Sequence, residues 1–150
     1  MTTINDNDFY LKVAYALSGC QLVEQQLKSY ISDALDFIRK RLGGKLPFKM
    51  NGDDYEDVPL GRLIDVFRKL SDNDALVKDL NKFKLERNFL SHKGISHCID
   101  PEGELFQTTV QDFEKRLSAI EKEAQRLLVA INDEGNMFRA HLWFDEIPNT

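Results

Sequence analysis

Three polar side chains near the middle of the chain, Arg87, Asn88 and His92, are of types that suit chemistry on a phosphodiester. Arginine keeps its positive charge at any ordinary pH and offers a planar fork of donors that matches a phosphate, whereas histidine gains and loses a proton near neutral pH. A histidine could accept the proton of a ribose 2′-hydroxyl while an arginine neutralises the charge that develops on the phosphate. This chemistry requires no metal ion.

Arg87 stands where helical spacing calls for an apolar residue. At about 100° per residue, four side chains share a narrow sector of one helix: Leu80, Phe83, Arg87 and Leu90. We therefore expect Arg87 to point toward the core, where a guanidinium is costly unless it is paired. Either a carboxylate from another helix meets it, with Glu24 as the candidate structural partner, or it lines a cavity that receives an anion.

Asn88 and His92 are four residues apart and share a second face of the same helix. Arg87 and His92 are about 140° apart on an ideal helix, so they converge only if the helix frays near Gly94, if the long arginine bends round, or if two chains contribute. A histidine in the last helical turn is also favoured by the helix dipole alone, which is the structural alternative to catalysis.

Other basic and aromatic residues are candidates for contacts with RNA. Lys84 and Lys93 flank the proposed site and either bind the substrate backbone or are ordinary surface lysines. The basic run 39–41 closes a helix, where positive charge complements the dipole, so a solvated helix end competes with an RNA contact. Trp143 and Phe144 either stack on a base or dock on the bundle.

No metal or cofactor site is expected. His97 and Cys98, taken with Cys20 or His141, show no zinc-site spacing. The two cysteines are far apart in a chain that lacks an export signal, so buried or idle thiols are favoured over a disulfide.

Hydrophobic periodicity predicts four helices that position these residues, over 9–41, 59–71, 74–92 and 110–131. Glycines at 43 and 44 end the first helix. The stretch 43–58 is expected to be a loop, and 95–108 a loop or a small hairpin. The third helix is apolar on two sides, so its second side is expected to face a fifth element or a second copy of the chain, which would place His92 at a dimer interface.

Length and composition indicate one domain over 1–150, and the helical periodicity makes it all-α, with its core at about 9–131. The C-terminal tail at 135–150 is expected to pack as a short helix or as an extended segment. The net charge of -5 argues against a protein that coats nucleic acid through bulk electrostatics, although it leaves room for a small basic site. No apolar run approaches the ~20 residues that span a bilayer, and the first residues do not form a signal peptide, so we expect a cytoplasmic location.

The stretch "ERNFLSHKG", with Arg87, Asn88 and then His92 after three intervening positions, resembles the R-N-x-x-x-H signature of HEPN-domain proteins. The segments "LSGCQLVEQQLKSYI" and "VPLGRLIDVFRKL" look like the first and second helices of such domains. In architecture the likeness covers residues 9 to 131, and the short motif carries the chemistry.

This resemblance implies an antiparallel four-helix bundle, commonly dimeric, and a metal-independent endoribonuclease of the kind found in toxin–antitoxin, phage-defence and RNA-processing systems. Arg87 and His92 would be the catalytic pair, and Asn88 would position the phosphate or the histidine. One toxin subgroup has a tyrosine two positions after the histidine, where this chain has Gly94, so a nucleotidyltransferase antitoxin is not the expected partner. The alternative function is a non-catalytic module that binds a protein partner or a nucleotide.

Overall fold

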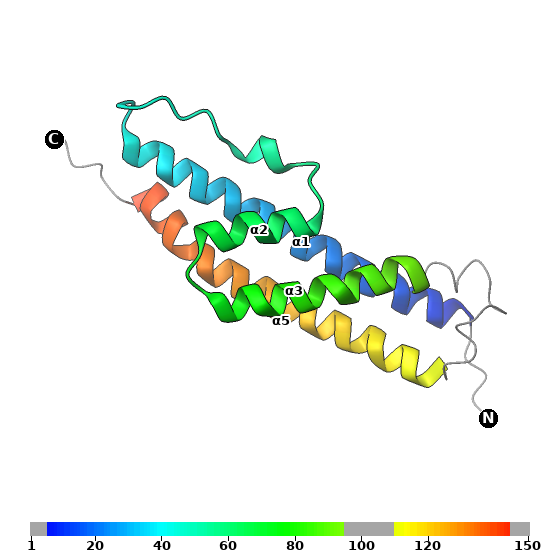
Figure 1. Ribbon diagram of the computed structural model, residues 1–150. Coiled ribbons are helices and arrows are strands. Elements are labelled where there is room, and N and C mark those ends of the chain that lie inside the picture. The colour runs from blue at the N-terminus through cyan, green and yellow to red at the C-terminus, as the bar shows by residue number, and fades with distance from the viewer. Residues whose placement is uncertain (1–5, 95–109, 145–150) are drawn as a thin grey trace.

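The computed structural model describes the backbone of residues 6–94 and 110–144, and Figure 1 shows its helices. The elements in chain order are α1 (Asp6–Leu42), η1 (Gly52–Tyr55), α2 (Leu60–Leu70), α3 (Asp74–Phe89), η2 (Leu90–Gly94) and α5 (Val110–Phe144). The prediction of an all-α helical bundle is confirmed, and no strand occurs in the described ranges. The loop or hairpin expected at 95–108 lies outside the described residues.

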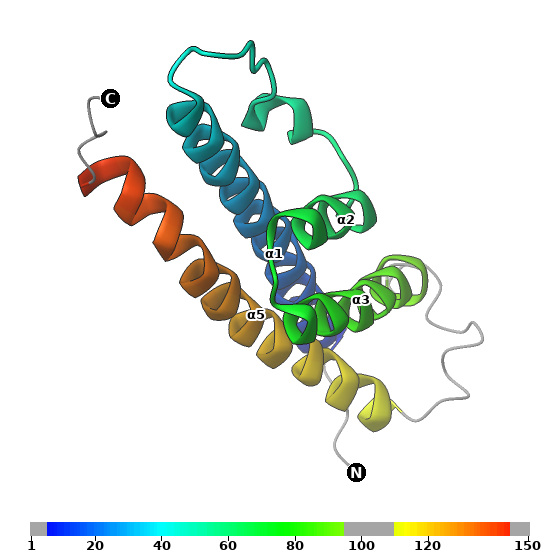
Figure 2. The same ribbon diagram turned by 60° about the vertical axis from the view of Figure 1, so that its left-hand side comes forward.

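The two long helices, α1 and α5, run side by side in the same direction (Figures 1 and 2). At one end Phe9 stacks on Phe113 with a centroid distance of 5.3 Å, and at the other Phe37 packs on Phe138 at 5.5 Å. Residue numbers thus rise together along both helices. Helix α3 runs in the opposite direction and is the antiparallel member of the bundle.

The parallel pairing of α1 and α5 differs from the antiparallel arrangement that we expected for the bundle, and the stretch 43–59 explains the difference. It turns back along α1, because Arg39 donates to the carbonyl of Met50 and Gly52 lies against Ser32. Helix α2 therefore starts beside the middle of α1, and α3 then returns to the end where α1 began. The next long helix has to start at that same end.

Local signals account for most helix boundaries. Helix α1 ends at Gly43 and Gly44, whose φ angles of 57° and 78° lie in the left-handed region that glycine adopts readily. Pro59 precedes α2 with an extended backbone. At the start of α3 the Asn73 side chain accepts a hydrogen bond from the backbone N–H of Leu76 at 3.1 Å and so caps the helix.

Helix α5 continues well beyond the predicted end near Ile131 and includes much of the stretch 135–150, which we expected to be a separate short helix or an extended tail. Phe138 is buried and packs on Tyr30 at a centroid distance of 5.2 Å, which extends the core past residue 131. The last turn is also held by Lys40, whose ammonium donates to the carbonyls of His141 and Leu142 at 3.1 Å each. Packing against the C-terminal half of α1 therefore sustains the helix where its own periodicity is weak.

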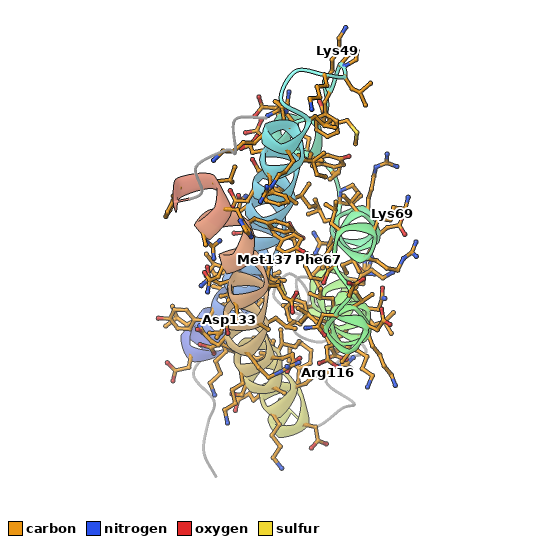
Figure 3. The ribbon with its side chains drawn as sticks, turned by 90° about the vertical axis from the view of Figure 1, so that its left-hand side faces the viewer. Lys49, Phe67, Lys69, Arg116, Asp133 and Met137 are labelled. Carbon is orange, nitrogen blue, oxygen red and sulfur yellow. The ribbon has the colours of Figure 1, made fainter. Side chains whose placement is uncertain are left out.

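The core lies along the two long helices, where α2 and α3 cover it. Phe67 of α2 is fully buried against Tyr30, whereas Lys69 of the same helix points away from the bundle (Figure 3). Small residues let α1 and α5 approach closely, since a Cβ added to Gly19 would lie 2.9 Å from the Cβ of Ala124. Among the helices that the structure describes, none has the length and apolar content needed to cross a membrane.

Candidate active site

Arg87 lies in the last turn of α3 and reaches across to α1. Its Nε is 3.4 Å from Oε1 of Glu24, so the structure contains the ion pair that was one of the two alternatives for Arg87. The Arg87 side chain is 39% exposed and that of Glu24 is 19% exposed. We expected the guanidinium to point into the core, and the structure instead leaves it partly open to solvent. The long side chain leaves the apolar sector of α3 and carries its charge to the edge of the bundle.

The contact with Glu24 uses one nitrogen of the Arg87 guanidinium. Within the described residues, the Arg87 side chain has no hydrogen-bond acceptor, and Glu24 is the acid paired with it. The terminal nitrogens of the fork are therefore available to another acceptor. An ion pair as exposed as this one contributes on the order of 0–1 kcal/mol to stability, so the pair is a weak reason for an arginine at this position.

Cys20 lies one turn before Glu24 on α1 and is buried. Burial raises the pKa of its thiol to about 11, because the charged thiolate is poorly solvated there. The positive charge of Arg87 acts in the opposite direction, and the negative charge of Glu24 raises this pKa further. The field of the Arg87–Glu24 pair thus extends from the edge of the bundle into the core at Cys20.

Asn88 and His92 are both exposed, so the second face expected for them is a solvent-facing one. His92 does not lie in a regular continuation of α3, because Leu90–Gly94 forms the π-helical turn η2. A π-helical turn bonds residue i to residue i+5 and is wider than an α-helical turn. This widening reduces the angle of about 140° that separates Arg87 and His92 on an ideal helix. We expected fraying near Gly94, and the structure has a π-helical distortion there instead.

Residues on either side of Arg87 and Asn88 hold this end of α3 against α5. Glu86 accepts two hydrogen bonds from Arg116, at 2.7 Å from Nε and 3.0 Å from an Nη atom. The Arg116 guanidinium also lies 3.4 Å from the ring centroid of Phe89, and Phe89 packs on Phe113 at 5.6 Å. Glu86 and Phe89 therefore anchor one side of the helix, while Arg87 and Asn88 point elsewhere.

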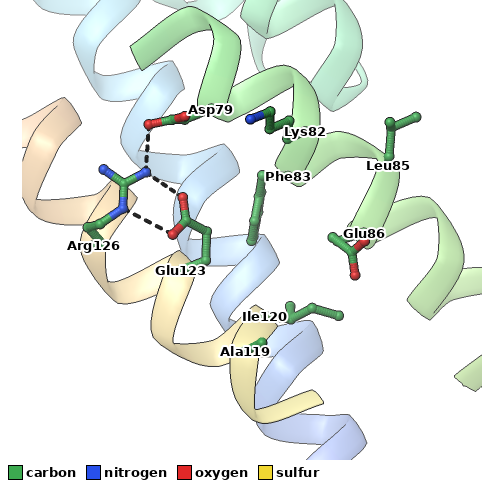
Figure 4. A pocket seen from close by; sticks show the side chains of 9 residues that line it. All are labelled: Asp79, Lys82, Phe83, Leu85, Glu86, Ala119, Ile120, Glu123 and Arg126. Carbon is green, nitrogen blue, oxygen red and sulfur yellow. Dashed lines mark hydrogen bonds and ion pairs between the residues drawn. The ribbon is translucent and has the colours of Figure 1, made fainter. Parts of the chain in front are cut away.

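The α3 side that carries Leu85 borders a hollow between α3 and α5 with a volume of about 610 Å³ (Figure 4). Phe83 and Ile120 form its apolar floor, and Leu85 at its edge is 64% exposed. Arg126 closes one end through hydrogen bonds to Asp79 and Glu123, at 2.8 and 3.0 Å. The structure describes no fifth element over this side of α3.

The predicted substrate-binding lysines have different outcomes. Lys84 extends across the first turn of α2, because its Cδ is 3.4 Å from the point where Gly61 would carry a Cβ. It borders a hollow between α2 and α3 together with Arg62, Arg68 and Asn81. The side chain of Lys93 lies outside the described residues.

No cluster of three or more candidate metal ligands occurs in the part of the chain that the structure describes. Cys20 lies in the middle of α1, whereas the His141 ring packs on Phe37 near the C-terminal end of α1, about 25 Å further along. His97 and Cys98 belong to the residues that the structure does not describe.

The basic run 39–41 is engaged within the bundle. Arg39 pairs with Asp36 at 2.7 Å, Lys40 holds the end of α5 as above, and Arg41 lies 5.2 Å from the ring centroid of Phe37. These contacts favour the helix-end interpretation of the run. Trp143 is 71% exposed, so it does not dock on the bundle. It belongs to the last turn of α5, and this end of α5 lies opposite to the end of the bundle that carries η2.

Comparison with known proteins adds no relatives. No protein-family model matches the chain, and no curated protein or solved structure is significantly similar to it. The HEPN-like motif therefore stays a prediction drawn from the residues themselves.

Sequence reasoning missed two groups of residues around the motif. Arg116 holds Glu86 from thirty positions away, and no local pattern signals that contact. Arg62 and Arg68 lie beside Lys84, and the excess of basic over acidic residues in 60–70 was the available signal. Both groups become evident only when α2 and α5 are placed next to α3.

Proposed function

We propose that this protein is a cytoplasmic, metal-independent endoribonuclease of the HEPN type, with Arg87, Asn88 and His92 as its catalytic residues. The observation that supports this most is the state of Arg87. It carries a guanidinium on the core-facing side of α3, yet it is 39% exposed and has one acid contact, through Nε. A fork of donors at the solvent edge suits a visiting phosphate.

The proposed reaction is a transesterification within the RNA strand. His92 accepts the proton of a ribose 2′-hydroxyl, and the 2′-oxygen forms a bond to the adjacent phosphorus while the bond from phosphorus to the 5′-oxygen breaks. The products are a 2′,3′-cyclic phosphate and a 5′-hydroxyl, whose oxygen takes up a proton. Arg87 stabilises the negative charge that builds on the phosphate oxygens, and Asn88 orients the phosphate or the imidazole.

We propose that the active form is a homodimer in which two motifs line one cleft. Leu85 is 64% exposed and Asn88 and His92 are exposed, so this face of α3 carries both an apolar contact and the polar residues of the motif. Leu85→Asp should convert the dimer to a monomer in sedimentation velocity and lower RNA cleavage. A wild-type chain that stays monomeric at tens of micromolar while cleaving RNA would refute the shared cleft.

The central experiment compares wild type with His92→Ala and Arg87→Ala on structured and single-stranded RNA, with and without EDTA. We expect cleavage by wild type in EDTA and a loss of on the order of 10²–10⁴-fold in His92→Ala, with a loss of about 10²–10³-fold in Arg87→Ala. End-group analysis should find the cyclic phosphate. Circular dichroism must first establish that every variant folds.

Matched controls come from the opposite end of the bundle. His141→Ala and Arg41→Ala remove the same side-chain types near the end of α1, and they should leave cleavage unchanged. Equal cleavage by wild type and His92→Ala, or loss of cleavage in EDTA, would contradict the proposal.

The second candidate is a non-catalytic module that binds an amphipathic helix of a protein partner in the hollow between α3 and α5. The observation in its favour is an apolar floor of Phe83 and Ile120 between charged rims, which is the form of a helix-binding groove. The family resemblance implies an antitoxin as one kind of protein partner for this surface. Three results together would replace the nuclease with this candidate. Wild type would cleave no RNA, Arg87→Ala would still capture a helical partner, and Ala119→Glu would fail to capture it.

A further inference from the structure

A second hollow, of about 400 Å³, lies between α2 and α3 on the side away from α5. Its polar lining residues are Arg62, Asp65, Arg68, Asn81 and Lys84. Three cations thus surround one carboxylate in a chain whose overall charge is -5. Such a local reversal of charge marks a place where a negative group is favoured.

The carboxylate in this hollow does not neutralise all of its cations. Asp65 accepts a hydrogen bond from Arg68 at 2.9 Å and lies 3.8 Å from Lys69. The pKa of Asp65 is below its ordinary value, first because of the hydrogen bond from Arg68 and then because of the positive charge of Lys69, with a smaller contribution from Arg62. The Asp65 carboxylate is therefore ionised at neutral pH. Among the described residues Arg62 and Lys84 form no ion pair. The cluster therefore has at least two uncompensated positive charges.

Gly61 brings Lys84 into the hollow. A Cβ at Gly61 would lie 3.4 Å from Cδ and 3.8 Å from Nζ of Lys84. The aliphatic part of Lys84 therefore lies against the backbone of α2 at Gly61, and its ammonium lies close to the start of this helix, where Arg62 follows Gly61. An unpaired surface lysine would normally sample solvent. Here it is placed across the gap between two helices.

The hollow continues into the motif along one face of α3. Asn81, Lys84 and Asn88 follow one another at spacings of three and four residues, so all three lie on the same side of the helix. Lys84 and Asn88 are about 6 Å apart along the helix axis. A chain of phosphates that passes Arg87 and Asn88 can therefore extend toward the cations of the hollow.

We propose that the hollow between α2 and α3 binds a backbone phosphate of the RNA that flanks the phosphate to be cleaved. Arg62 offers a planar fork to the two non-bridging phosphate oxygens, Lys84 supplies a point charge, and the amide nitrogen of Asn81 donates to one of the same two oxygens. This inference rests on the proposed function, because it names the part of the protein that holds the substrate beside the reacting bond.

The test measures binding of a single-stranded RNA oligonucleotide by fluorescence anisotropy as the KCl concentration is varied. His92→Ala serves as the background, so that the RNA stays intact. Arg62→Gln and Lys84→Gln should each weaken binding and lower the slope of log affinity against log salt by about 0.7 per lost phosphate contact. Lys122→Gln, an exposed lysine of α5, removes the same charge elsewhere and should leave the slope unchanged.

Failure of this site and failure of the nuclease are distinguishable. If wild type cleaves RNA through His92 but Arg62→Gln and Lys84→Gln bind like Lys122→Gln, the phosphate site is wrong and the nuclease stands. If wild type cleaves nothing while the two substitutions still weaken RNA binding relative to Lys122→Gln, the site stands without the reaction. An absence of RNA binding by the His92→Ala and wild-type proteins overturns both.

Discussion

Glu24 approaches Arg87 from α1 and contacts its Nε at 3.4 Å, leaving the outer part of the guanidinium toward solvent. A bidentate pair, like that of Arg116 with Glu86, would also have occupied a terminal nitrogen of the fork. The observed contact instead orients the arginine from its inner side. An arginine held in this way keeps donors for a second acceptor, and a phosphate has the matching oxygens.

Replacing Glu24 should therefore separate structure from chemistry. Glu24→Gln should lower the free energy of unfolding by less than about 1 kcal/mol, because the pair is partly exposed, and should leave RNA cleavage largely intact. Arg87→Lys keeps the charge but loses the fork, so its cleavage rate should fall while its stability holds. Urea unfolding and initial cleavage rates provide the two measurements. A loss of several kcal/mol in Glu24→Gln would instead identify a structural ion pair.

The Cys20 thiol should be unreactive in the folded protein. Its pKa is raised to about 11 from 9.0 by burial, so little thiolate exists at neutral pH and a reagent has no path to it. In a Cys98→Ser background, Ellman's reagent should label Cys20 slowly in buffer and completely in 6 M guanidinium chloride. Rapid labelling in buffer would show that this part of α1 opens.

The same thiol predicts a direction for alkaline stability. Below pH 9 it is protonated in both the folded and the unfolded chain and contributes no difference. Between pH 9 and about 11 the unfolded chain ionises first, so the free energy of unfolding should fall as the pH rises through this window. Cys20→Ala in the Cys98→Ser background should show a shallower fall, measured by urea unfolding at several pH values. An unchanged slope would refute a raised pKa at Cys20.

Arg116 should stabilise the end of α3 that carries the motif. It makes two hydrogen bonds to Glu86 and lies over the Phe89 ring, so Arg116→Met should destabilise the protein by about 1–2 kcal/mol. Amide hydrogen exchange should rise at residues 87–92 more than in α2. Lys115→Met, one position earlier and exposed, is the matched control. Uniform exchange across the helices would argue against a local role.

Gly19 should not accept a larger residue. Its Cβ position is 2.9 Å from the Cβ of Ala124, so Gly19→Val must separate α1 from α5 and should cost about 1–3 kcal/mol. Ser18→Val, at the neighbouring exposed position, introduces the same β-branched side chain without this clash. Thermal unfolding of the two variants gives the comparison, and equal melting temperatures would contradict the close approach.

The periodic parts of the fold were predictable from the sequence, because the apolar spacing of 9–41 and the glycines after it determine α1 through local rules. The length of α5 was not, since Phe138 and Lys40 stabilise its last turns through contacts across a hundred residues. The direction of α5 relative to α1 depends on the path of 43–59, which has no periodic signal.

For the candidate site, helical spacing identified the sector of Arg87 and the possible partner Glu24. Helical spacing did not predict the exposure of the Arg87 guanidinium, because a helical wheel gives the direction of a Cβ and not the path of a long side chain. The π-helical turn at Leu90–Gly94 depends on backbone hydrogen bonds that no residue type announces. The cations beside Lys84 come together only through the packing of α2 on α3.

The shared direction of α1 and α5 has a practical consequence for anyone who attaches the protein to a surface or a fusion partner. The start of α1 and the turn η2 lie toward one end of the bundle, and the end of α5 lies at the other. An affinity tag or fluorophore joined after Phe144 would leave the motif accessible. The same addition before Asp6 would crowd the motif and would disturb the proposed dimer at that end of the bundle.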